Sequence, residues 1–175
     1  TIENQAFVLD IKIEGDVVPE QVKIDFENQT YFLKKINSQH FQYKFKALKK
    51  SVQFQLSSGE VVSNRFELNV LSAPKILSSS LLLNFPSYTK LKDKIVSNFG
   101  NISIPEGTKL TWSFLTKSTD SVTFINKKTV FNFKKIDDKF IFSKQVFSDL
   151  VYTVNTNNKQ LKNYETLSYE AKVVK

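Results

Sequence analysis

Apolar and polar residues alternate with a period of two along most of this chain, and this alternation constrains the fold more than any other feature. In the segment 7–14 every second residue from Phe7 onward is apolar, whereas Asp10, Lys12 and Glu14 fall between them. Successive side chains of a strand point to opposite faces, so this spacing predicts half-buried strands rather than helices. Large aromatic residues suit the same pleated surface, and the 175 residues include 16 Phe and 6 Tyr.

Similar segments recur in both halves of the chain. We expect strands at Val22–Phe26, Tyr31–Ile36, Phe41–Phe45, Val52–Leu56, Phe66–Val70, Leu81–Phe85, Ile102–Ile104, Leu110–Phe114, Val122–Phe124, Val130–Phe133, Phe140–Phe142, Leu150–Val154 and Leu167–Val173. Turn residues separate them, as at Gly15-Asp16 and Ser57-Ser58-Gly59-Glu60. The segment 87–101 is polar, and Leu91 and Ile95 in it are spaced for one helical turn. Many short strands separated by turns are typical of antiparallel sandwiches and barrels.

An internal repeat indicates a duplicated domain rather than one large sheet. Leu33-Lys34-Lys35-Ile36, followed by Phe41-Gln42-Tyr43, recurs as Phe133-Lys134-Lys135-Ile136, followed by Phe140-Ile141-Phe142. The strands on each side of the two copies also correspond in order, which is the pattern that a repeated structural unit produces.

The boundary between the copies is predicted within Ser72–Leu77, where a proline interrupts the alternation. We therefore predict an all-β chain of two tandem immunoglobulin-like antiparallel β-sandwich domains, residues 1–73 and 74–175. The second has a longer N-terminal strand and loop segment. The first lacks a counterpart of Leu81 to Ile104, so its opening strand is expected to lie before Thr1.

Two aromatic residues fit an immunoglobulin-like second domain. That fold carries a tyrosine two residues before its second core cysteine, and Tyr152 lies two residues before Val154, which would take the cysteine's place. Trp112 is then expected to be a buried core residue of an early strand, with Leu110 and Phe114 flanking it on the same strand face.

The residue inventory removes most catalytic and metal chemistry. Without cysteine, no disulfide, thiolate nucleophile or zinc–cysteine site can form. The single histidine, His40, would have to serve any Ser-His-Asp triad, but it lies where a turn enters a strand, and we interpret it as an ordinary exposed turn residue.

Acidic residues offer one concentrated pair, Asp137-Asp138, which could hold a cation. Its position in a hairpin turn between lysines favours a structural role, because aspartate is a preferred turn residue. Asp120, Asp149 and Glu165 are isolated acids at turns or strand edges. No phosphate-binding glycine loop, calcium-binding loop or zinc spacing occurs, so we predict no catalytic, cofactor-binding or metal-binding residues and no enzymatic activity.

The formal net charge of +8 raises the possibility of nucleic-acid binding. However, Arg65 is the only arginine among 25 basic residues, and recognition of phosphate and base edges depends on the bidentate guanidinium group. The lysines are scattered beside carboxylates, so we predict a solubilising surface and no nucleic-acid partner.

The ends of the chain and its hydropathy point to a fragment of a larger protein. The sequence begins at Thr1 and contains no methionine, so a signal peptide or membrane anchor is expected upstream. No stretch approaches the roughly 18 apolar residues of a spanning helix. We predict that this fragment is not itself inserted in a membrane and is monomeric.

Three segments of the second half carry a family resemblance. They are Leu83-Asn84-Phe85-Pro86-Ser87-Tyr88-Thr89, then Ser97-Asn98-Phe99-Gly100-Asn101-Ile102, then Ile104-Pro105-Glu106-Gly107-Thr108-Lys109-Leu110-Thr111-Trp112-Ser113-Phe114. Together they resemble the tandem immunoglobulin-like repeats of a family of very large, uncharacterised, membrane-anchored envelope proteins of Bacteroidetes. The likeness extends over roughly 1–175, and Leu91-Lys92 departs from it, because a glycine-containing turn is expected there.

The resemblance implies an extracytoplasmic, periplasmic location in the cell envelope, with tethering through the full-length protein, and it carries over no catalytic residue. We therefore expect a structural and protein-interaction module that binds a protein partner through strand edges or loops such as 87–101 and 156–165. The alternative is a carbohydrate-binding module with exposed aromatic residues on one sheet face. Four aromatic residues are candidates for that face: Phe32, Phe99, Phe131 and Tyr164.

Overall fold

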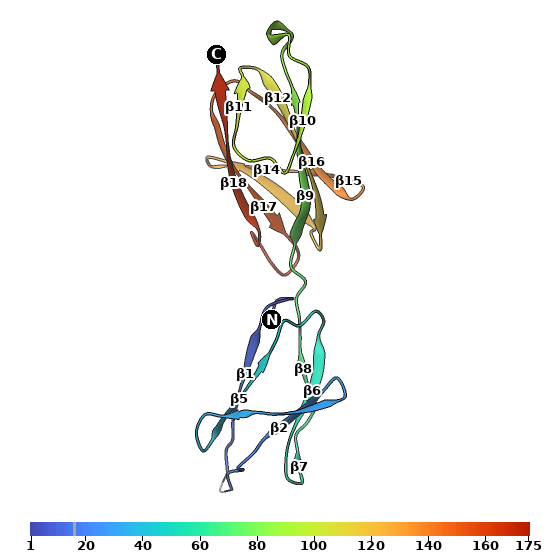
Figure 1. Ribbon diagram of the computed structural model, residues 1–175, viewed down its shortest axis with the longest axis vertical. Helices are drawn as coiled ribbons and strands as arrows, with labels where there is room; N and C mark the ends of the chain where they lie inside the picture. Colours follow the sequence, from blue (N-terminus) through green and yellow to red (C-terminus); the bar gives the residue numbers. More distant parts are fainter. Residues whose placement is uncertain (16) are drawn as a thin grey trace. The chain divides into compact units, whose positions relative to one another are not determined.

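Strands account for nearly all of the regular structure in the computed structural model, so the prediction of an all-β chain is confirmed. The structure describes residues 1–15 and 17–175; Asp16, from the turn expected at Gly15-Asp16, lies outside the described residues. Within the described part, the one helical element is a 3₁₀ turn, η1 (Ser87–Thr89). The chain divides into two compact units, unit 1 (Thr1–Ser72) and unit 2 (Ala73–Lys175) (Figure 1).

Unit 2 contains the longer strands. They are β9 (Lys75–Asn84), β10 (Lys94–Ser97), β11 (Ile102–Pro105), β12 (Thr108–Lys117), β13 (Ser121–Asn126), β14 (Thr129–Asn132), β15 (Lys134–Ile136), β16 (Lys139–Val146), β17 (Leu150–Asn157) and β18 (Thr166–Val174). One 5-stranded sheet has the order β10-β9-β12-β16-β15, and the other has the order β11-β18-β17-β13-β14. Neighbouring strands are antiparallel, except that β11 runs parallel to β18.

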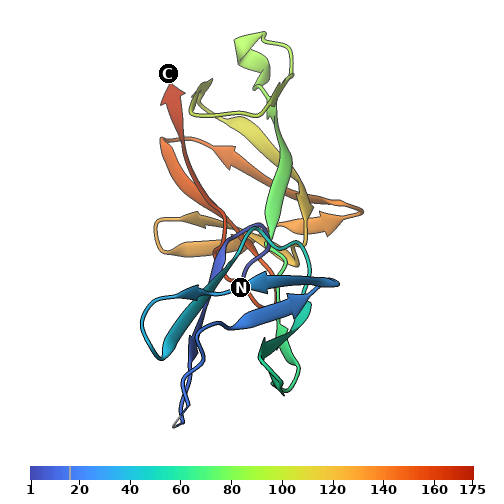
Figure 2. The same cartoon turned by 60° about the horizontal axis from the view of Figure 1, so that its bottom comes forward.

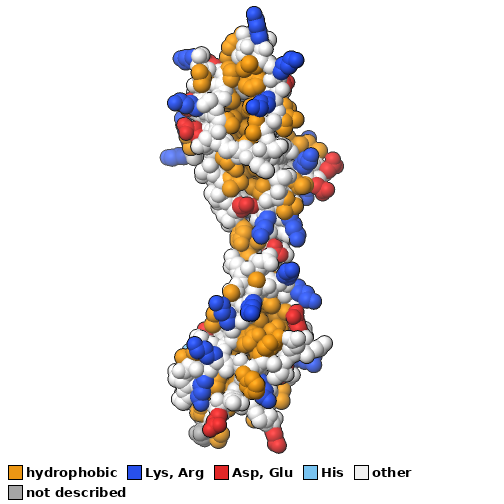
Figure 3. All heavy atoms as spheres, in the orientation of Figure 1, with side chains coloured by type: hydrophobic (Ala, Val, Ile, Leu, Met, Phe, Trp, Pro, Cys, Tyr) orange, Lys and Arg blue, Asp and Glu red, His pale blue; other side chains and the backbone are white. Residues whose placement is uncertain are grey.

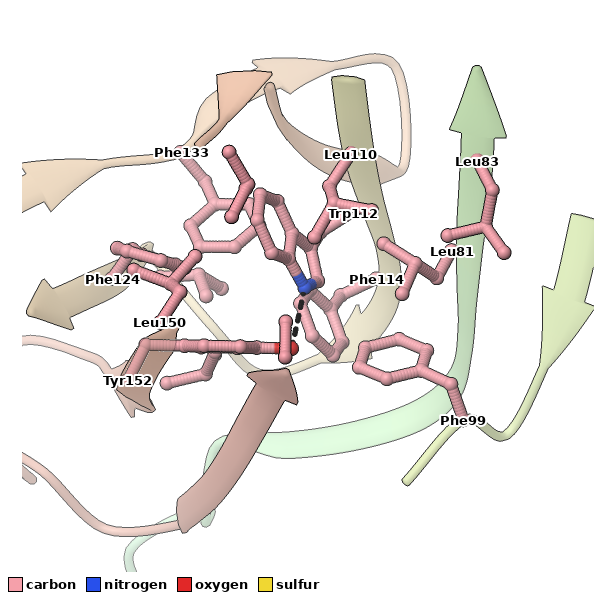
Figure 4. Packing of buried hydrophobic residues seen from close by; sticks show 14 of the residues in the cluster. Leu81, Leu83, Phe99, Leu110, Trp112, Phe114, Phe124, Phe133, Leu150 and Tyr152 are labelled. Carbon is pink, nitrogen blue, oxygen red and sulfur yellow. Dashed lines mark hydrogen bonds between the residues drawn. The ribbon is translucent and has the colours of Figure 1, made fainter. Parts of the chain in front are cut away.

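The core of unit 2 forms where the inward side chains of the two sheets meet. On β12, Leu110, Trp112 and Phe114 are completely buried, as predicted for one face of a strand. Phe124 and Tyr152 from the other sheet contact Trp112, with ring centroids 5.1 and 5.2 Å from the indole (Figure 4). The predicted burial of Trp112 is therefore confirmed.

Unit 1 has shorter strands. They are β1 (Phe7–Lys12), β2 (Lys23–Phe26), β3 (Gln29–Phe32), β4 (Lys34–Lys35), β5 (His40–Phe45), β6 (Val52–Ser58), β7 (Val61–Val62) and β8 (Phe66–Leu68). One sheet has the order β1-β5-β4; the other has the order β3-β2-β6-β7, and β8 also pairs with β6. Seven buried apolar residues form the core between them: Val22, Ile24, Leu33, Phe41, Phe45, Val52 and Phe54.

Strand pairing repeats from one unit to the other, as the duplicated sequence predicts. The pairs β1–β5, β2–β3 and β2–β6 of unit 1 match β12–β16, β13–β14 and β13–β17 of unit 2. A parallel bridge between Ile2 and Leu71 takes the place of the parallel β11–β18 pair. Within the described residues of unit 1, no strand matches β9 or β10. The sequence predicts that unit 1 lacks a counterpart of the whole segment from Leu81 to Ile104. This prediction is wrong for the C-terminal end of the segment, because β11 corresponds to the bridge at Ile2.

The segment 87–101 is more ordered than a polar loop. It contains η1 and then β10, which pairs with β9; the helical turn lies at Ser87–Thr89 rather than between Leu91 and Ile95. Pro86, in an extended conformation, ends β9 before this turn. In both views η1 lies at the same end of unit 2 as the C-terminus (Figures 1 and 2).

Candidate strand-docking edge

Strand β1 lies at the edge of its sheet and pairs with β5 alone. Ile13, one residue beyond β1, donates its amide to the carbonyl of Gln39 at 2.9 Å. Because peptide groups of alternate residues in an antiparallel strand point to opposite sides, the odd-numbered residues of β1 bond to β5. The N–H and C=O groups of Val8, Asp10 and Lys12 therefore point away from the sheet. These groups make up the longest open edge of unit 1 within the described residues.

The equivalent edge in unit 2 is covered. There β9 pairs antiparallel with β12 along most of its length (Figure 1). The repeat aligns Tyr43 with Phe142, and these residues pair with Leu9 and Trp112 respectively. Leu9 therefore occupies the position of Trp112. In unit 2 this position is opposite Leu81 of β9, whereas in unit 1 no described residue lies opposite Leu9 on that side.

The missing strands also leave part of the core of unit 1 open to solvent. In unit 2, Phe99 follows β10 and is only 5% exposed. Its ring lies 6.0 Å from that of Phe114 (Figure 4) and 5.1 Å from that of Tyr169. The strand pairing aligns Tyr169 with Phe66 of β8. Phe66 stacks on Phe54 with centroids 5.5 Å apart, yet it is 47% exposed. Unit 1 thus leaves an aromatic ring exposed at a position that Phe99 covers in unit 2.

A second feature of unit 1 is a cluster of aromatic side chains around a cavity of about 250 Å³. Its lining includes Phe26, Tyr31, Tyr43 and Phe45. The centroid of the Phe26 ring lies 5.0 Å from that of Tyr31, 5.7 Å from that of Tyr43 and 5.1 Å from that of Phe45. Burial raises the pKa of the Tyr43 hydroxyl, and the neighbouring Tyr31 raises it further. Alternation predicts strands at these four residues but does not reveal the cavity.

Unit 2 fills the equivalent place differently. Strand pairing aligns Phe26 with Asn126 and Phe45 with Lys144. The ammonium group of Lys144 lies 5.2 Å from the centre of the Phe131 ring, the counterpart of Tyr31. A cation over an aromatic face is attracted by the ring quadrupole. The aromatic cluster is therefore specific to unit 1.

A polar hollow of about 310 Å³ lies elsewhere on unit 1. Its lining includes Asp25, Glu27, Gln55 and Arg65, and the hydroxyl of Thr30 donates to the carboxylate of Asp25. Within residues 1–15 and 17–175, no three His, Asp or Glu side chains are grouped so that they could hold a metal ion. The hollow can accommodate a small polar molecule, but it offers no recognisable catalytic set.

The candidate residues considered from the sequence lie apart from one another. His40 was expected to be an exposed turn residue, but it is the half-buried first residue of β5, and its Nε2 lies 3.4 Å from the carboxylate of Asp10 on β1. Gln42 donates to the same carboxylate at 2.6 Å. Asp137, with φ of 50°, and Asp138 form the turn between β15 and β16, as predicted for turn residues.

The isolated acids have structural hydrogen bonds. Asp120 donates its amide to the carbonyl of Asn157 at 2.8 Å. Asp149 accepts from the amide of Val173 at 2.7 Å, and Glu165 accepts from the amide of Ile76 at 2.7 Å.

The four aromatic residues proposed for a sugar-binding platform do not form one. Phe99 is buried and Phe131 contacts the core of unit 2. Phe32 belongs to unit 1 and is 62% exposed, with the ammonium group of Lys23 5.3 Å from its ring centre. Tyr164 lies in the segment after β17, where its amide donates to Thr156. A coplanar platform of these residues is therefore not part of the fold.

The lysines are dispersed over the visible face of both units in Figure 3 rather than gathered in one patch. This distribution fits a solubilising surface. The described residues contain no helix that is long and apolar enough to span a membrane.

Alternation alone does not reveal the open edge of β1, but the sequence carries one signal for it. The alternation identifies β1 as a strand, and the repeat shows that the first copy lacks the segment that becomes β9 and β10. When the two copies are aligned by strand, β1 corresponds to the central strand β12, but β1 has no neighbouring strand on one side.

Compared with known proteins, the chain matches no protein-family model, and a search of curated proteins gives no match either.

Proposed function

We propose that this chain is a non-enzymatic structural and protein-interaction module, built from two tandem immunoglobulin-like β-sandwiches. In this proposal it extends a large membrane-anchored protein of the cell envelope into the periplasm and binds a protein partner through a strand edge. The observation that carries the binding role is the open edge of β1, whose inward residues Phe7, Leu9 and Ile11 are only half-buried.

The strand order of unit 2 supports the immunoglobulin-like assignment. In immunoglobulin domains one sheet has strands A, B, E and D and the other has G, F, C and, in variable-type domains, C′. The sheets β9-β12-β16-β15 and β18-β17-β13-β14 follow these two orders, and β10 and β11 extend them. In this correspondence Trp112 lies on strand B and Tyr152 on strand F.

Contacts within the distinctive segments of unit 2 support the envelope-protein assignment. The hydroxyl of Tyr88, from the Phe-Pro-x-Tyr segment, donates to the carbonyl of Glu106, from the Pro-Glu-Gly-Thr segment, at 2.6 Å. A side chain added at Gly107 would lie 3.4 Å from Pro86. The residues of the family resemblance therefore contact one another, as expected for a motif that preserves one turn arrangement.

The open edge suits recognition of an extended peptide. Unpaired N–H and C=O groups at a sheet edge can form a ladder with another strand, while alternate side chains provide specificity. Folded proteins commonly protect such edges with short strands, charges or bulges. β1 carries Asp10 and Lys12 on its outer face but is 6 residues long, enough for several ladder bonds.

The second candidate function, carbohydrate binding, rests on a different observation from the one expected. The cavity lined by Phe26, Tyr31 and Tyr43 presents aromatic faces and two hydroxyl groups. Aromatic side chains with a few polar groups are typical of small-molecule sites.

Parallel binding screens separate the two functions. The 175-residue chain would be tested against a library of random extended peptides and against an array of glycans with peptidoglycan included. The proposal predicts binding of peptides, and loss of it in Val8→Pro, which removes an outward N–H at an edge where proline is tolerated. The matched control Val8→Thr keeps that N–H and should bind as the wild type does. Glycan binding that is lost in Tyr43→Ala, with no peptide binding, would contradict the proposal and favour the second function.

A further inference from the structure

We propose that the occupant of the β1 edge is an extended segment of the same kind as β9, which binds antiparallel to β1 and is supplied by a partner protein. This inference rests on the proposed function, because it identifies the chemistry of the peptide that the open edge accepts. The two copies of the repeat provide the argument: unit 2 contains the covered form of an edge that unit 1 leaves open.

The register of the occupant follows from strand alignment. Strand β5 of unit 1 corresponds to β16 of unit 2, so the residues that pair with equivalent positions on these two strands also correspond. By this criterion Phe7, Leu9 and Ile11 occupy the positions of Leu110, Trp112 and Phe114. In unit 2 those three positions pair with Leu83, Leu81 and Ser79 of β9. The occupant should therefore have apolar side chains opposite Phe7 and Leu9, and a small residue opposite Ile11.

Burial supports this choice of side chains. In unit 2, Leu81 is completely buried and Leu83 is nearly so, because both point into the core beside β12 (Figure 4). In unit 1, Phe7, Leu9 and Ile11 remain half-buried along the open edge. Two apolar side chains in the positions of Leu81 and Leu83 would remove this surface from water, and burial of apolar surface drives association.

The exposed Phe66 indicates that the occupant extends further. Its counterpart Tyr169 is covered by Phe99, which follows β10. An occupant that also includes a β10-like return and an aromatic residue would cover Phe66 in the same way. The segment from Lys75 to Asn101 contains all of these features, so it is a suitable probe.

Other edges of unit 1 are weaker candidates. The edge strands β3, β4 and β7 have 4, 2 and 2 residues. The counterparts of β3 and β4 in unit 2, β14 and β15, are also edge strands. β8 has 3 residues, and the bridge between Ile2 and Leu71 takes the place of β11 beside it. β1 is longer, and its counterpart β12 has the full strand β9 as an additional neighbour, which selects this edge for the proposal.

The test uses two synthetic peptides and the 15N-labelled 175-residue chain. The first peptide has the sequence of Lys75–Asn84, with lysines added for solubility; the second is identical except for Leu81→Asp and Leu83→Asp. We expect the first peptide to slow amide hydrogen exchange of Val8, Asp10 and Lys12 at least tenfold, and the second to leave it unchanged. Val8→Pro should weaken binding at least tenfold, and a peptide extended to Asn101 should bind more tightly than Lys75–Asn84 alone.

Orientation is tested with a nitroxide label at the C-terminus of the first peptide. In the antiparallel register Leu83 lies opposite Phe7, so the label should broaden resonances near Phe7 more than those near Lys12. Any one of four results would overturn the inference: the opposite broadening pattern, binding at another edge, equal binding of the two peptides, or no binding of the first peptide. Binding of unrelated alternating peptides at β1 would overturn it while leaving the proposed function standing. Protection of the edge that depends on protein concentration, without peptide, would instead identify a second copy as the occupant.

Discussion

The indole Nε1 of Trp112 donates a hydrogen bond to the hydroxyl of Tyr152 at 2.8 Å, from one sheet of unit 2 to the other (Figure 4). Both residues are almost completely buried. Buried polar groups are stable when they are hydrogen-bonded, so this contact allows two large amphipathic rings to fill the core. Tyr152 thus serves as the acceptor for the tryptophan.

Replacing Tyr152 with phenylalanine removes this acceptor and leaves the indole N–H buried without it. We expect Tyr152→Phe to lower the free energy of unfolding by about 1–3 kcal/mol, the usual cost of an unsatisfied buried donor. Urea denaturation followed by tryptophan fluorescence measures this loss. Tyr169→Phe, which alters a half-buried ring nearby, serves as the control and should cost less. Equal losses in the two variants would show that the hydrogen bond has no particular role.

Trp112 itself should be among the most sensitive positions of unit 2. We expect Trp112→Ala to cost about 3–5 kcal/mol, because it removes a fully buried aromatic side chain and leaves a cavity. Since Trp112 is the single tryptophan, the emission spectrum of the wild type should be blue-shifted by its apolar surroundings. The matched comparison is Val151→Ala on the exposed face of β17, which should cost little. A loss below about 1 kcal/mol for Trp112→Ala would contradict the core assignment.

Alkaline pH should destabilise the chain through its buried tyrosines. Burial raises the pKa values of Tyr152 and Tyr169 above the ordinary value of 10.0. The folded state therefore holds these phenolic protons more tightly than the unfolded chain. Stability should be full below about pH 10 and should fall as the pH rises above it, because ionisation then favours the unfolded state. Denaturation from about pH 8 to about pH 11 should show this decline, and Tyr152→Phe should make it shallower; an unchanged slope would contradict the assignment.

Gly107 has a backbone conformation that only glycine adopts easily, with φ of 82°. We expect Gly107→Ala to cost about 1–2 kcal/mol, the penalty of a Cβ in the left-handed region. The added methyl would also lie 3.4 Å from Pro86 and 3.7 Å from Phe147. Gly100→Ala is the control, since a Cβ there meets nothing within 4 Å. Thermal unfolding of both variants should separate them, and similar midpoints would mean that the turn tolerates a side chain.

Much of this fold follows from local sequence, because alternation depends only on which face of a strand is buried. The strand that contains Trp112 and its buried neighbours were predicted correctly for this reason, as was the turn at Asp137-Asp138. β10 was interpreted as loop because it is an edge strand: Ile95 is exposed and the pattern around it is weak. Pairing with β9 keeps it extended, and Val96 is its one half-buried residue.

The candidate site was harder to predict than the fold. Which strand of a sheet lacks a neighbour depends on pairing between distant segments, and the sequence of β1 resembles that of any half-buried strand. The aromatic cluster around Tyr43 was also hidden, because Phe26 and Phe45 look like ordinary core residues until their counterparts, Asn126 and Lys144, are aligned with them. Pairing information, which alternation does not contain, was necessary for both.

Amide hydrogen exchange in the free chain distinguishes an open β1 edge from a covered one. We expect the amides of Val8, Asp10 and Lys12 to exchange rapidly, while those of Leu9 and Ile11, which bond to β5, are protected. Lys109, Thr111 and Ser113 of the doubly paired β12 provide the internal reference and should all be protected. Rapid exchange of alternate residues in β1 would support the open edge. Equal protection of Val8, Asp10 and Lys12 with their neighbours in dilute solution would contradict it.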